Sequence, residues 1–458
     1  MRLFPSASSR STSQSCTSLL LSALLGAQAA QAAITLNLDD PKSIRNAAKT
    51  ASEKLVSYYT GYRPGDVPGN LPAPYYWWEA GAMFGALIEY WHYTGDDQHN
   101  EITTQALLHQ VGRDLDYQPT NQSRTSGNDD QAFWGMTAMT AAEDKFPDPP
   151  EDQPQWLALA QAVFNTQAPR WYNDTCGGGL KWSITSFGNG WTYKNTISNG
   201  CFFNIAARLA RYTGNGTYQN WAETSWDWMT SVGYISPSYQ VFDGADDDDN
   251  CTAINHVQWS YNSGVLLHGA ASMYNLTGSD VWKQHVLGML KGAEIFFQKD
   301  VMTEVACENN GKCNVDQRSF KAYLSRWMAA TVALAPFTHD IIMPKLRASA
   351  TAAALQCSGP GNACGLRWTK GAAYDGETGV GEQMSALEVI QGNLVDFVPG
   401  PATQKSGGTS KGDPEAGSGP KSSVPELSDI TMGDKVGAGF MTSIILVCVF
   451  GGVWWMIA

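Results

Sequence analysis

The stretch FNIAARLARYTGNGTYQNWAETSWDWM (Phe203–Met229) contains two helical patterns on either side of a Thr-Gly turn. Apolar residues recur at intervals of three and four positions in both halves, which is the spacing of one face of an α-helix. Between the halves, Gly214 can take the left-handed conformation that ends a helix, and Asn215 can cap the next one. The stretch therefore predicts a helical hairpin.

The same turn recurs at Tyr93–Asp96 (YTGD) and Leu276–Ser279 (LTGS), each time after an apolar helical run. Strand-like alternation is scarce. An array of hairpins must bury its inner faces, either as an open superhelix or as a closed ring. Irregular spacing and long loops, such as Trp171–Asn199, argue against a regular superhelix. We predict an all-α fold, an (α/α)6 barrel in which six helical hairpins form a toroid and long loops build a cleft at one end.

A second stretch, GNDDQAFWG (127–135), places Asp129 beside Asp130. One explanation is helix capping, because Asn128 to Gln131 fits the N-x-x-Q form of a capping box and acidic residues are favoured in a first turn. The other is catalysis, since glycoside hydrolysis needs two carboxyl groups, about 5 to 5.5 Å apart for retention or roughly 6.5 to 9.5 Å for inversion. Adjacent side chains that splay from a helix start can reach the shorter separation, so capping does not exclude catalysis.

The composition indicates which class of partner to expect. The net charge of −13 and a pI near 5.0 argue against nucleic acid, which needs a basic surface. Many of the 17 Trp, 18 Tyr and 16 Phe residues stand beside Asp, Asn or Gly, as in PYYWWEAG and NGWTYKN. Aromatic faces stack on sugar rings while Asp and Asn hydrogen-bond hydroxyl groups, so this mixture favours a carbohydrate cleft. Core packing is the competing explanation for each aromatic residue.

The cysteines indicate an oxidising compartment. CENNGKC (307–313) and CSGPGNAC (357–364) each predict a small disulfide loop. Cys176 and Cys251 lie beside polar, loop-like stretches and are candidates for a third disulfide, whereas Cys201 lies in an apolar helical pattern that favours a free buried thiol. No Cys/His spacing is typical of a metal site, and we expect neither a metal nor a cofactor.

The two ends predict secretion and membrane attachment. Arg2 and Arg10 precede an apolar run and small residues, as in a signal peptide. The apolar run Phe440–Ala458 favours a GPI-attachment signal over a retained transmembrane helix, and five Asn-x-Ser/Thr sequons agree with a glycosylated surface protein. The expected segments are a signal peptide at 1–32, the barrel domain at 33–399, a flexible Gly/Ser/Pro-rich stalk at 400–435 and a hydrophobic attachment signal at 436–458.

A second acidic segment, DGADDDDNC (Asp243–Cys251), has several explanations. Its oxygen atoms could bind Ca²⁺, but their spacing does not match an EF-hand loop, and a solvated acidic loop is the simpler alternative. The nearby residues Gln258, Trp259, Tyr261 and Asn262 leave a sugar-binding role open. No G-x-S-x-G elbow, HExxH motif or P-loop is present, so the adjacent aspartates remain the strongest candidates for chemistry.

Several of these segments together resemble the fungal members of glycoside hydrolase family 76, the mannan endo-1,6-α-mannosidase-like proteins. The segments are YYWWEAGAMFGALIEYW, GNDDQAFWG, CGGGLKW, YKNTISNGCFFNIAARLARYTGN, DGADD and FKAYLSRWMAATVALAP, and the likeness runs from about Leu36 to Leu394. The resemblance implies an (α/α)6 barrel and a retaining mechanism on α-1,6-linked mannose, with Asp129 as the nucleophile and Asp130 as the general acid/base. Four consecutive Asp stand where the family pattern has two, so only Asp246 and Asp247 carry over, as substrate-binding candidates.

For the GPI-anchored branch, the resemblance also implies a transglycosylase that moves another protein from its GPI glycan onto cell-wall glucan. The sequence thus predicts a retaining glycosidase or transglycosidase, anchored on the outer face of the plasma membrane and in the cell wall. Its donor would be α-1,6-mannan or a GPI-core glycan, and its acceptor cell-wall β-glucan. The alternative is a non-catalytic mannan-binding or structural wall protein on the same barrel. Trp78, Asn128, Trp134 and Asn199 are the further candidates for binding sugar.

Overall fold

The computed structural model describes residues 33–418, 441–443 and 446. The predicted signal peptide and almost all of the predicted attachment signal lie outside the described residues. Residues up to Ser418 form one compact unit, and the described residues after it, a short helical piece at 441–443 and residue 446, belong to another. Within the described ranges, no helix is both long enough and apolar enough to cross a membrane.

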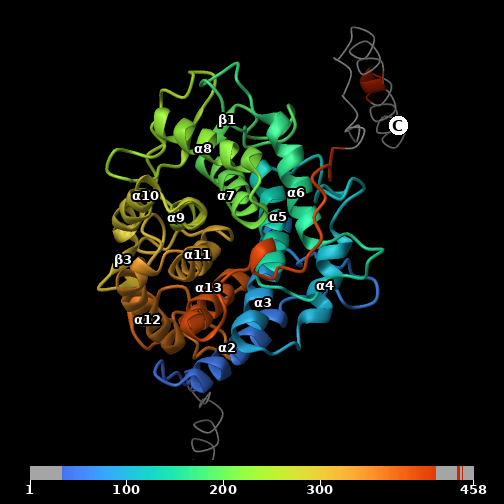
Figure 1. The fold of residues 1–458 in the computed structure, drawn as a ribbon. Coiled ribbons are helices and arrows are strands. Elements are labelled where there is room, and N and C mark those ends of the chain that lie inside the picture. Colours follow the sequence, from blue (N-terminus) through green and yellow to red (C-terminus); the bar gives the residue numbers. More distant parts are fainter. Residues whose placement is uncertain (1–32, 419–440, 444–445, 447–458) are drawn as a thin grey trace, which may run out of the picture. The chain divides into compact units, whose positions relative to one another are not determined.

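Residues 33–418 form twelve α-helices that alternate between an inner and an outer ring (Figure 1). The inner helices are α3 (Trp77–Thr94), α5 (Asn128–Glu143), α7 (Thr196–Thr213), α9 (Ser260–Thr277), α11 (Phe320–Leu334) and α13 (Val380–Gln391). The outer helices are α2 (Pro41–Val56), α4 (Asn100–His109), α6 (Trp156–Gln167), α8 (Gly216–Ser231), α10 (Asp280–Gly292) and α12 (His339–Gln356). Each inner helix packs against the next, and α13 packs against α3, which closes the ring. The predicted (α/α)6 barrel is confirmed.

Five of the six hairpins follow the chain, and the sixth joins its two ends. Helices α3 to α12 pair consecutively, whereas α13 packs against α2 from the beginning of the domain. Across this junction the side chain of Gln383 donates a hydrogen bond to the carbonyl of Ala51, at 3.2 Å. Closure therefore depends on residues separated by almost the whole barrel domain.

The predicted Thr-Gly turns end three inner helices. The left-handed residues are Gly95 (φ 76°), Gly214 (φ 73°) and Gly278 (φ 64°). Asn215 and Ser279 then accept hydrogen bonds from the first turns of α8 and α10, as expected for caps. The turn at Gly95 differs, because four residues separate Gly95 from the start of α4 at Asn100. The N-cap residue there, His99, makes no side-chain cap hydrogen bond.

Short elements and loops complete the barrel. The two small antiparallel sheets are β1 (Tyr193–Asn195) with β2 (Gly244–Asp246), and β3 (Phe297–Gln298) with β4 (Val301–Met302). The 3₁₀ helices are η1 (Ala168–Arg170), η2 (Ala293–Phe296), η3 (Gln317–Ser319), η4 (Pro336–Thr338), η5 (Trp368–Lys370), η6 (Gly392–Phe397) and η7 (Gln404–Ser406). Because β1 pairs with β2, the loop before α7 lies beside the second acidic segment.

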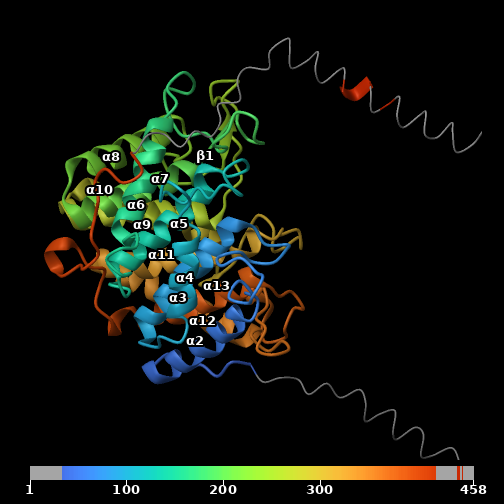
Figure 2. The same ribbon diagram turned by 90° about the vertical axis from the view of Figure 1, so that its right-hand side faces the viewer.

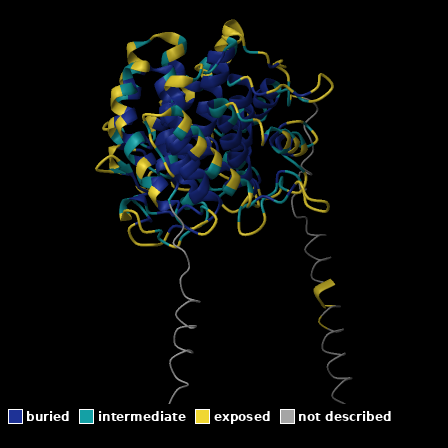
Figure 3. Ribbon diagram, turned by 90° about the horizontal axis from the view of Figure 1, so that it is seen from below, coloured by how far each residue is buried: buried dark blue, intermediate teal, exposed yellow. Residues whose placement is uncertain are grey.

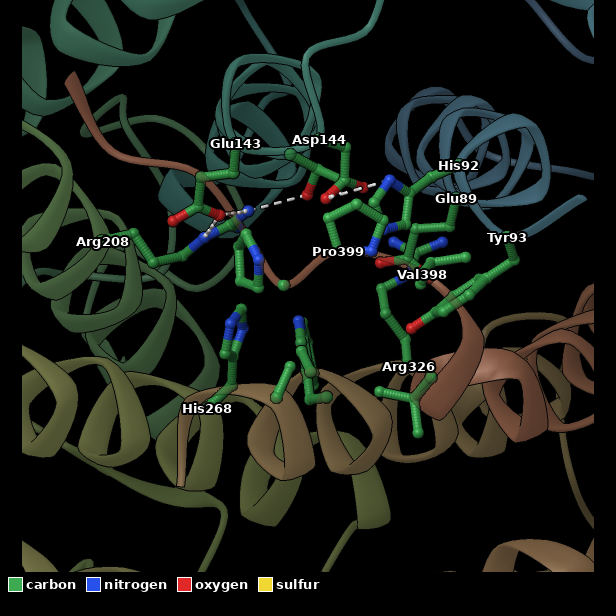
Figure 4. A pocket seen from close by; sticks show the side chains of 17 residues that line it. Glu89, His92, Tyr93, Glu143, Asp144, Arg208, His268, Arg326, Val398 and Pro399 are labelled. Atoms are coloured by element: carbon green, nitrogen blue, oxygen red, sulfur yellow. Dashed lines mark hydrogen bonds and ion pairs between the residues drawn. The ribbon is translucent and has the colours of Figure 1, made fainter. Parts of the chain in front are cut away.

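The inner helices are buried on all sides, and exposed residues lie on the outer helices and loops (Figure 3). In α7 every residue from Thr196 to Tyr212 is buried, including Arg208 and Arg211. Such charges need partners in the interior, and both arginines pair with Glu143 of α5, at 2.6 and 3.1 Å. These pairs lie at the end of the barrel where α5 and α7 finish, which we call the closed end (Figure 4).

The structure contains the two expected small disulfides and also joins Cys176 to Cys251, while Cys201 is free and buried. It differs from the sequence-based prediction at the C-terminal boundary. Residues 400–418, expected to begin the flexible stalk, pack and hydrogen-bond along the barrel. The small side chains that suggested flexibility instead allow close contact: a Cβ at Gly412 would stand 2.8 Å from the Gln161 side chain.

Candidate active site

The adjacent aspartates lie in the first turn of α5, at the end of the barrel where the inner helices begin. The N-cap residue is Gly127, and its N–H donates to Asp130 Oδ2 at 2.7 Å. The capping interaction predicted for Asn128 and Gln131 is therefore displaced by one residue, and it uses Asp130 as the acceptor. Capping by Asp130 therefore does not exclude the catalytic role expected for this turn.

Asp129 is held from the other side. Its Oδ2 accepts a hydrogen bond from the indole N–H of Trp182 at 2.9 Å, while its Oδ1 is buried without a hydrogen-bond partner. A Cβ on Gly127 would stand 2.2 Å from that Oδ1, far inside van der Waals contact. Glycine at the N-cap thus leaves the space that the Asp129 carboxylate occupies.

Asp129 opens into a pocket with a volume of about 160 Å³. The other lining residues come from the loops and helix starts of this end: Trp182, Tyr193, Asn195, Asp243, Trp259, Tyr261, Asn314, Asp316, Gln317 and Phe320. Aromatic rings dominate one wall, where Tyr261 stacks on Phe320 at 3.8 Å between ring centroids. A wall of this kind offers flat apolar faces to the C–H faces of a sugar.

Burial raises the pKa of both aspartates. The pKa of Asp129 lies well above its usual range because of burial and then the charge of Asp130, although the Trp182 hydrogen bond opposes the shift. Burial raises the pKa of Asp130 to about 6, against the stabilising N–H of Gly127 and with a further increase from Asp316. Two acids that repel each other at such pKa values share one proton near neutral pH. One carboxylate and one carboxylic acid are the pair that retaining glycoside hydrolysis requires.

Two more carboxylates face the pocket. Asp316 accepts a hydrogen bond from Trp78 Nε1 at 3.1 Å, and Asp243 accepts one from the Tyr193 hydroxyl at 2.7 Å. Burial raises the pKa of each, while these hydrogen bonds lower it. Asp243 also accepts a hydrogen bond from the Asn255 side chain at 3.3 Å. Each carboxylate keeps acceptor capacity beyond these bonds, so both are suited to accept hydrogen bonds from sugar hydroxyl groups.

Trp78 therefore borders the pocket through Asp316, as expected for a candidate binding residue. Trp134 does not: it is fully buried, with its ring stacked between Trp77 and Tyr117 and its N–H bonded to the Trp77 carbonyl. The structure therefore places Trp134 in the core and not among the residues that line the pocket. Successive residues of a helix face different directions, and Trp134 lies on the side of α5 that faces the core.

Three other candidates position a loop instead of lining the pocket. Asn128 donates to the Lys181 carbonyl, and Asn199 hydrogen-bonds both backbone groups of Leu180. Asp247 forms an ion pair with Lys181 at 2.6 Å. All three are buried, and all three hold the segment that presents Trp182 to Asp129. We correct their role from direct sugar binding to loop positioning.

Asp246 is exposed and lies outside the pocket lining, next to Thr192, whose hydroxyl donates to it at 3.3 Å. Its neighbours in the acidic segment also bond to protein groups: Asp247 to Lys181 and Thr175, and Asp249 to Thr252. Among the described residues, no cluster of three or more acidic, His or Cys side chains is arranged to hold a metal ion.

The residues that the sequence analysis missed are Trp182, Tyr193, Asp243 and Asp316. Trp182 ends the segment CGGGLKW, and Asp243 begins DGADD, so both stand in segments that had already attracted notice. Tyr193 likewise belongs to the quoted segment NGWTYKN. Asp316 offered no comparable signal, because it reaches the pocket only through the folding of a separate loop.

Comparisons with known proteins agree with this arrangement. Residues 43–405 match the model of glycosyl hydrolase family 76. The chain is 49% identical over 419 residues to mannan endo-1,6-α-mannosidase DCW1 of Eremothecium gossypii, covering 90% of this chain and 92% of the relative. It is 48% identical to the DCW1 protein of Saccharomyces cerevisiae, covering 93% of this chain and 95% of the relative.

Among solved structures, Dfg5 from Chaetomium thermophilum in complex with glucosamine is 47% identical, with a TM-score of 0.80 over 83% of this chain and 97% of that one. A more distant structure shares the fold. It is an inactive variant of the α-1,6-mannanase GH76A of Salegentibacter, with two neighbouring aspartates replaced by asparagine, in complex with α-1,6-mannotriose. It is 18% identical, with a TM-score of 0.61 over 78% of this chain and 99% of that one.

Proposed function

Because the chain belongs to glycosyl hydrolase family 76 and is a glycosidase, we propose that it cleaves α-1,6-mannosidic bonds with retention of configuration. The observation that carries the proposal is the pair Asp129 and Asp130 at the start of α5, with Asp129 bonded to Trp182 and open to an aromatic pocket. Relatives nearly half identical over most of the chain are named mannan endo-1,6-α-mannosidases. A mannanase of the same fold is inactive when two adjacent aspartates are replaced.

In the proposed mechanism the Asp129 carboxylate attacks the anomeric carbon, and the bond from that carbon to the leaving oxygen breaks. Asp130 gives its proton to that oxygen, which leaves a mannosyl ester on Asp129. Asp130 then takes a proton from the acceptor hydroxyl, whose oxygen displaces Asp129 and restores both groups. Water as the acceptor gives hydrolysis, and a sugar hydroxyl gives transglycosylation.

This mechanism uses one particular protonation state of the carboxylate pair. In the free protein burial raises the pKa of both aspartates, and the charge of Asp130 adds to the shift at Asp129, so the pair holds the proton jointly. The roles carried over from the family require it on Asp130. Positive charge that develops on the sugar ring beside Asp129 favours the ionised form of Asp129. Substrate binding and transition-state charge would therefore move the proton to Asp130.

Trapping the intermediate tests these roles. An activated fluorinated α-mannosyl donor should leave one mannosyl group on the peptide that contains residues 127–135, and tandem mass spectrometry should place it on Asp129. Label on Asp130 would reverse the two roles. Asp129→Asn and Asp130→Asn should both lose turnover of an α-1,6-linked oligomannoside while keeping affinity for it. Binding without turnover in the unmodified protein would instead support a non-catalytic mannan-binding protein.

We further propose a GPI-anchored enzyme at the outer plasma membrane that transfers GPI-linked proteins to cell-wall glucan. The apolar C-terminal run and the sequons support the location, and the resemblance to the GPI-anchored branch supports the reaction. Incubation with a GPI-core glycan and a β-glucan oligosaccharide should yield a hybrid glycan, detected by mass. Only shortened mannan would make it a hydrolase. Because a relative was solved with glucosamine, an amino sugar should be included as a ligand.

A further inference from the structure

The C-terminal segment 398–418, which we call the strap, starts at the closed end of the barrel. Val398 and Pro399 line the cavity there, beside His92 and Asp144 (Figure 4). The N–H of Ala402 donates to the Glu143 carbonyl at 2.8 Å. Arg211 also donates to the backbone carbonyls of Pro401 and Ala402. A chain that left the barrel here would leave it at the end opposite the carboxylate pair.

The strap does not leave there, because it turns and follows α6. Ser410 accepts a hydrogen bond from the N–H of Leu157 at 2.9 Å. Further along, the N–H of Asp413 donates to Gln161 at 2.7 Å. Asn165 then donates to the carbonyls of Pro414 and Ala416, both at 2.8 Å. The strap contacts α6 in order from its first turn to its last, so the two segments run in the same direction (Figures 1 and 2).

Helix α6 ends at the pocket. Its last residue, Gln167, donates to the carbonyl of Asn128 at 2.6 Å, directly before the carboxylate pair. The eight steps from Leu157 to Asn165 rise about 12 Å, half the length of the neighbouring α5. The strap therefore carries the chain from the closed end toward the catalytic end before Ser418.

The strap is fitted to its groove. A Cβ at Gly412 would stand 2.8 Å from Gln161 Oε1, and one at Gly417 would stand 2.8 Å from the Ala162 carbonyl. Gly417 also has a left-handed backbone, φ 74°, that other residues rarely adopt. These contacts show that the strap is packed closely against α6. The chain that follows Ser418 therefore continues from the catalytic end of the barrel.

We propose that the strap makes the catalytic end of the barrel its membrane-facing end, so that the pocket acts preferentially on glycans linked to lipid in the same membrane. The inference rests on the proposed membrane anchor. Because the described strap ends beside the last turn of α6, the chain after Ser418 leads to the anchor from the catalytic end. Without the strap contacts, the chain would lead to the anchor from the closed end and leave the barrel between the membrane and the pocket.

The orientation can be measured on the full anchored chain in lipid vesicles. Phe187, exposed on the loop that carries Trp182, and Val281, exposed at the closed end, are replaced one at a time by cysteine and labelled with a fluorophore. Among the described residues the free cysteine, Cys201, is buried and escapes labelling. Energy transfer to an acceptor on the lipid headgroups should be stronger from position 187. Equal transfer, or stronger transfer from position 281, would overturn the proposal.

The consequence for substrate choice is tested with a released strap. Gly412→Ala with Gly417→Ala removes the fit, and Gly400→Ala is the matched control because its Cβ would meet only Ala333 at an ordinary 3.8 Å. Release should lower turnover of a GPI-core glycan in the same vesicle about threefold or more, because a longer chain between the barrel and the anchor dilutes the enzyme at the surface. Turnover of a soluble α-1,6-oligomannoside should stay unchanged. If the ratio of GPI-core turnover to soluble turnover is equal in the released-strap variant and in Gly400→Ala, the strap does not have this role. If neither variant turns over the soluble oligomannoside, the proposed glycosidase activity itself is contradicted.

Discussion

Gly127 fixes the position of the Asp129 carboxylate because it has no side chain. We predict that Gly127→Ala folds but loses at least about tenfold in kcat/KM, since the new methyl group must displace Asp129 Oδ1, now only 2.2 Å from the Cβ position. Gly216→Ala is the control, because its Cβ would enter open space at the start of α8. Thermal unfolding and kinetics on an α-1,6-oligomannoside check both variants. Full activity in Gly127→Ala would show that Asp129 need not occupy this position.

Asp316 supports the acid form of Asp130. Its negative charge contributes to the pKa of about 6 at Asp130, so its removal should lower that pKa. The general acid then loses its proton at lower pH, and the alkaline limb of kcat/KM in Asp316→Asn should move to lower pH by about half a unit.

Asp243→Asn is the matched control for that shift. Asp243 also faces the pocket and has a pKa raised by burial, but it is not among the charges that raise the pKa of Asp130. The control should change rate without moving the alkaline limb. A limb that stays in place in Asp316→Asn, or moves equally in both variants, would remove Asp316 from this role.

The position of single residues was predictable where it depends on local sequence. Adjacent aspartates at a helix start are visible in the sequence, and both aspartates lie in the first turn of α5, although the N-cap is one residue earlier than expected. The binding candidates were less predictable, because facing direction depends on packing. Trp134 faces the core, and Asn128 and Asn199 hold a loop, so polar or aromatic character near the pair did not identify what touches the pocket.

The inner helices are held together by buried ion pairs that no periodicity predicts. Arg326 of α11 pairs with Glu388 of α13 at 2.5 Å and approaches Glu89 of α3 at 3.6 Å. We predict that Arg326→Met lowers the free energy of unfolding by about 3 to 5 kcal/mol, because it leaves buried carboxylates without a cation. Urea unfolding at pH 7 measures the loss.

The surface pair between Arg347 and Asp39 provides the comparison. Both side chains are exposed, so Arg347→Met should cost no more than about 1 kcal/mol. Similar losses in the two variants would mean that the interior pair is solvated or replaceable. Turnover per folded molecule should be unaffected in both, because Arg326 lines the closed end of the barrel.

Helices and their ends followed from sequence more reliably than loops did. The Gly stops of α3, α7 and α9 are local events that require a left-handed residue, and all three are present. The course of the loop from Trp171 to β1 is set by distant contacts, from Asn128, Asn199 and Asp247. Its folding brings Trp182 to Asp129, and only the folded chain reveals that contact.

The ring as a whole was predictable in kind, since apolar inner helices need a closed arrangement to be buried all round. The sequence did not predict where the domain ends or which helices close the ring. The strap has the composition of a linker, and the groove along α6 that receives it is formed by residues some 250 positions earlier. The closing hairpin likewise joins α2 to α13, and neither helix carries the Thr-Gly turn that marked three of the other hairpins.

Closure makes a testable difference to how stability is distributed. In an open array each repeat depends mainly on its neighbours, whereas in a closed ring a defect at the junction reaches every hairpin. Ala51 is buried on α2 against α13, so Ala51→Leu should overfill the junction at a cost of about 1 to 3 kcal/mol. We predict that amide hydrogen exchange quickens as much in α7 and α9, across the ring, as in α2 and α13. Glu53→Leu adds the same side chain on the exposed face of α2 and should leave exchange unchanged. Faster exchange confined to α2, α13 and α3 would show that the barrel behaves as an open array despite its closed shape.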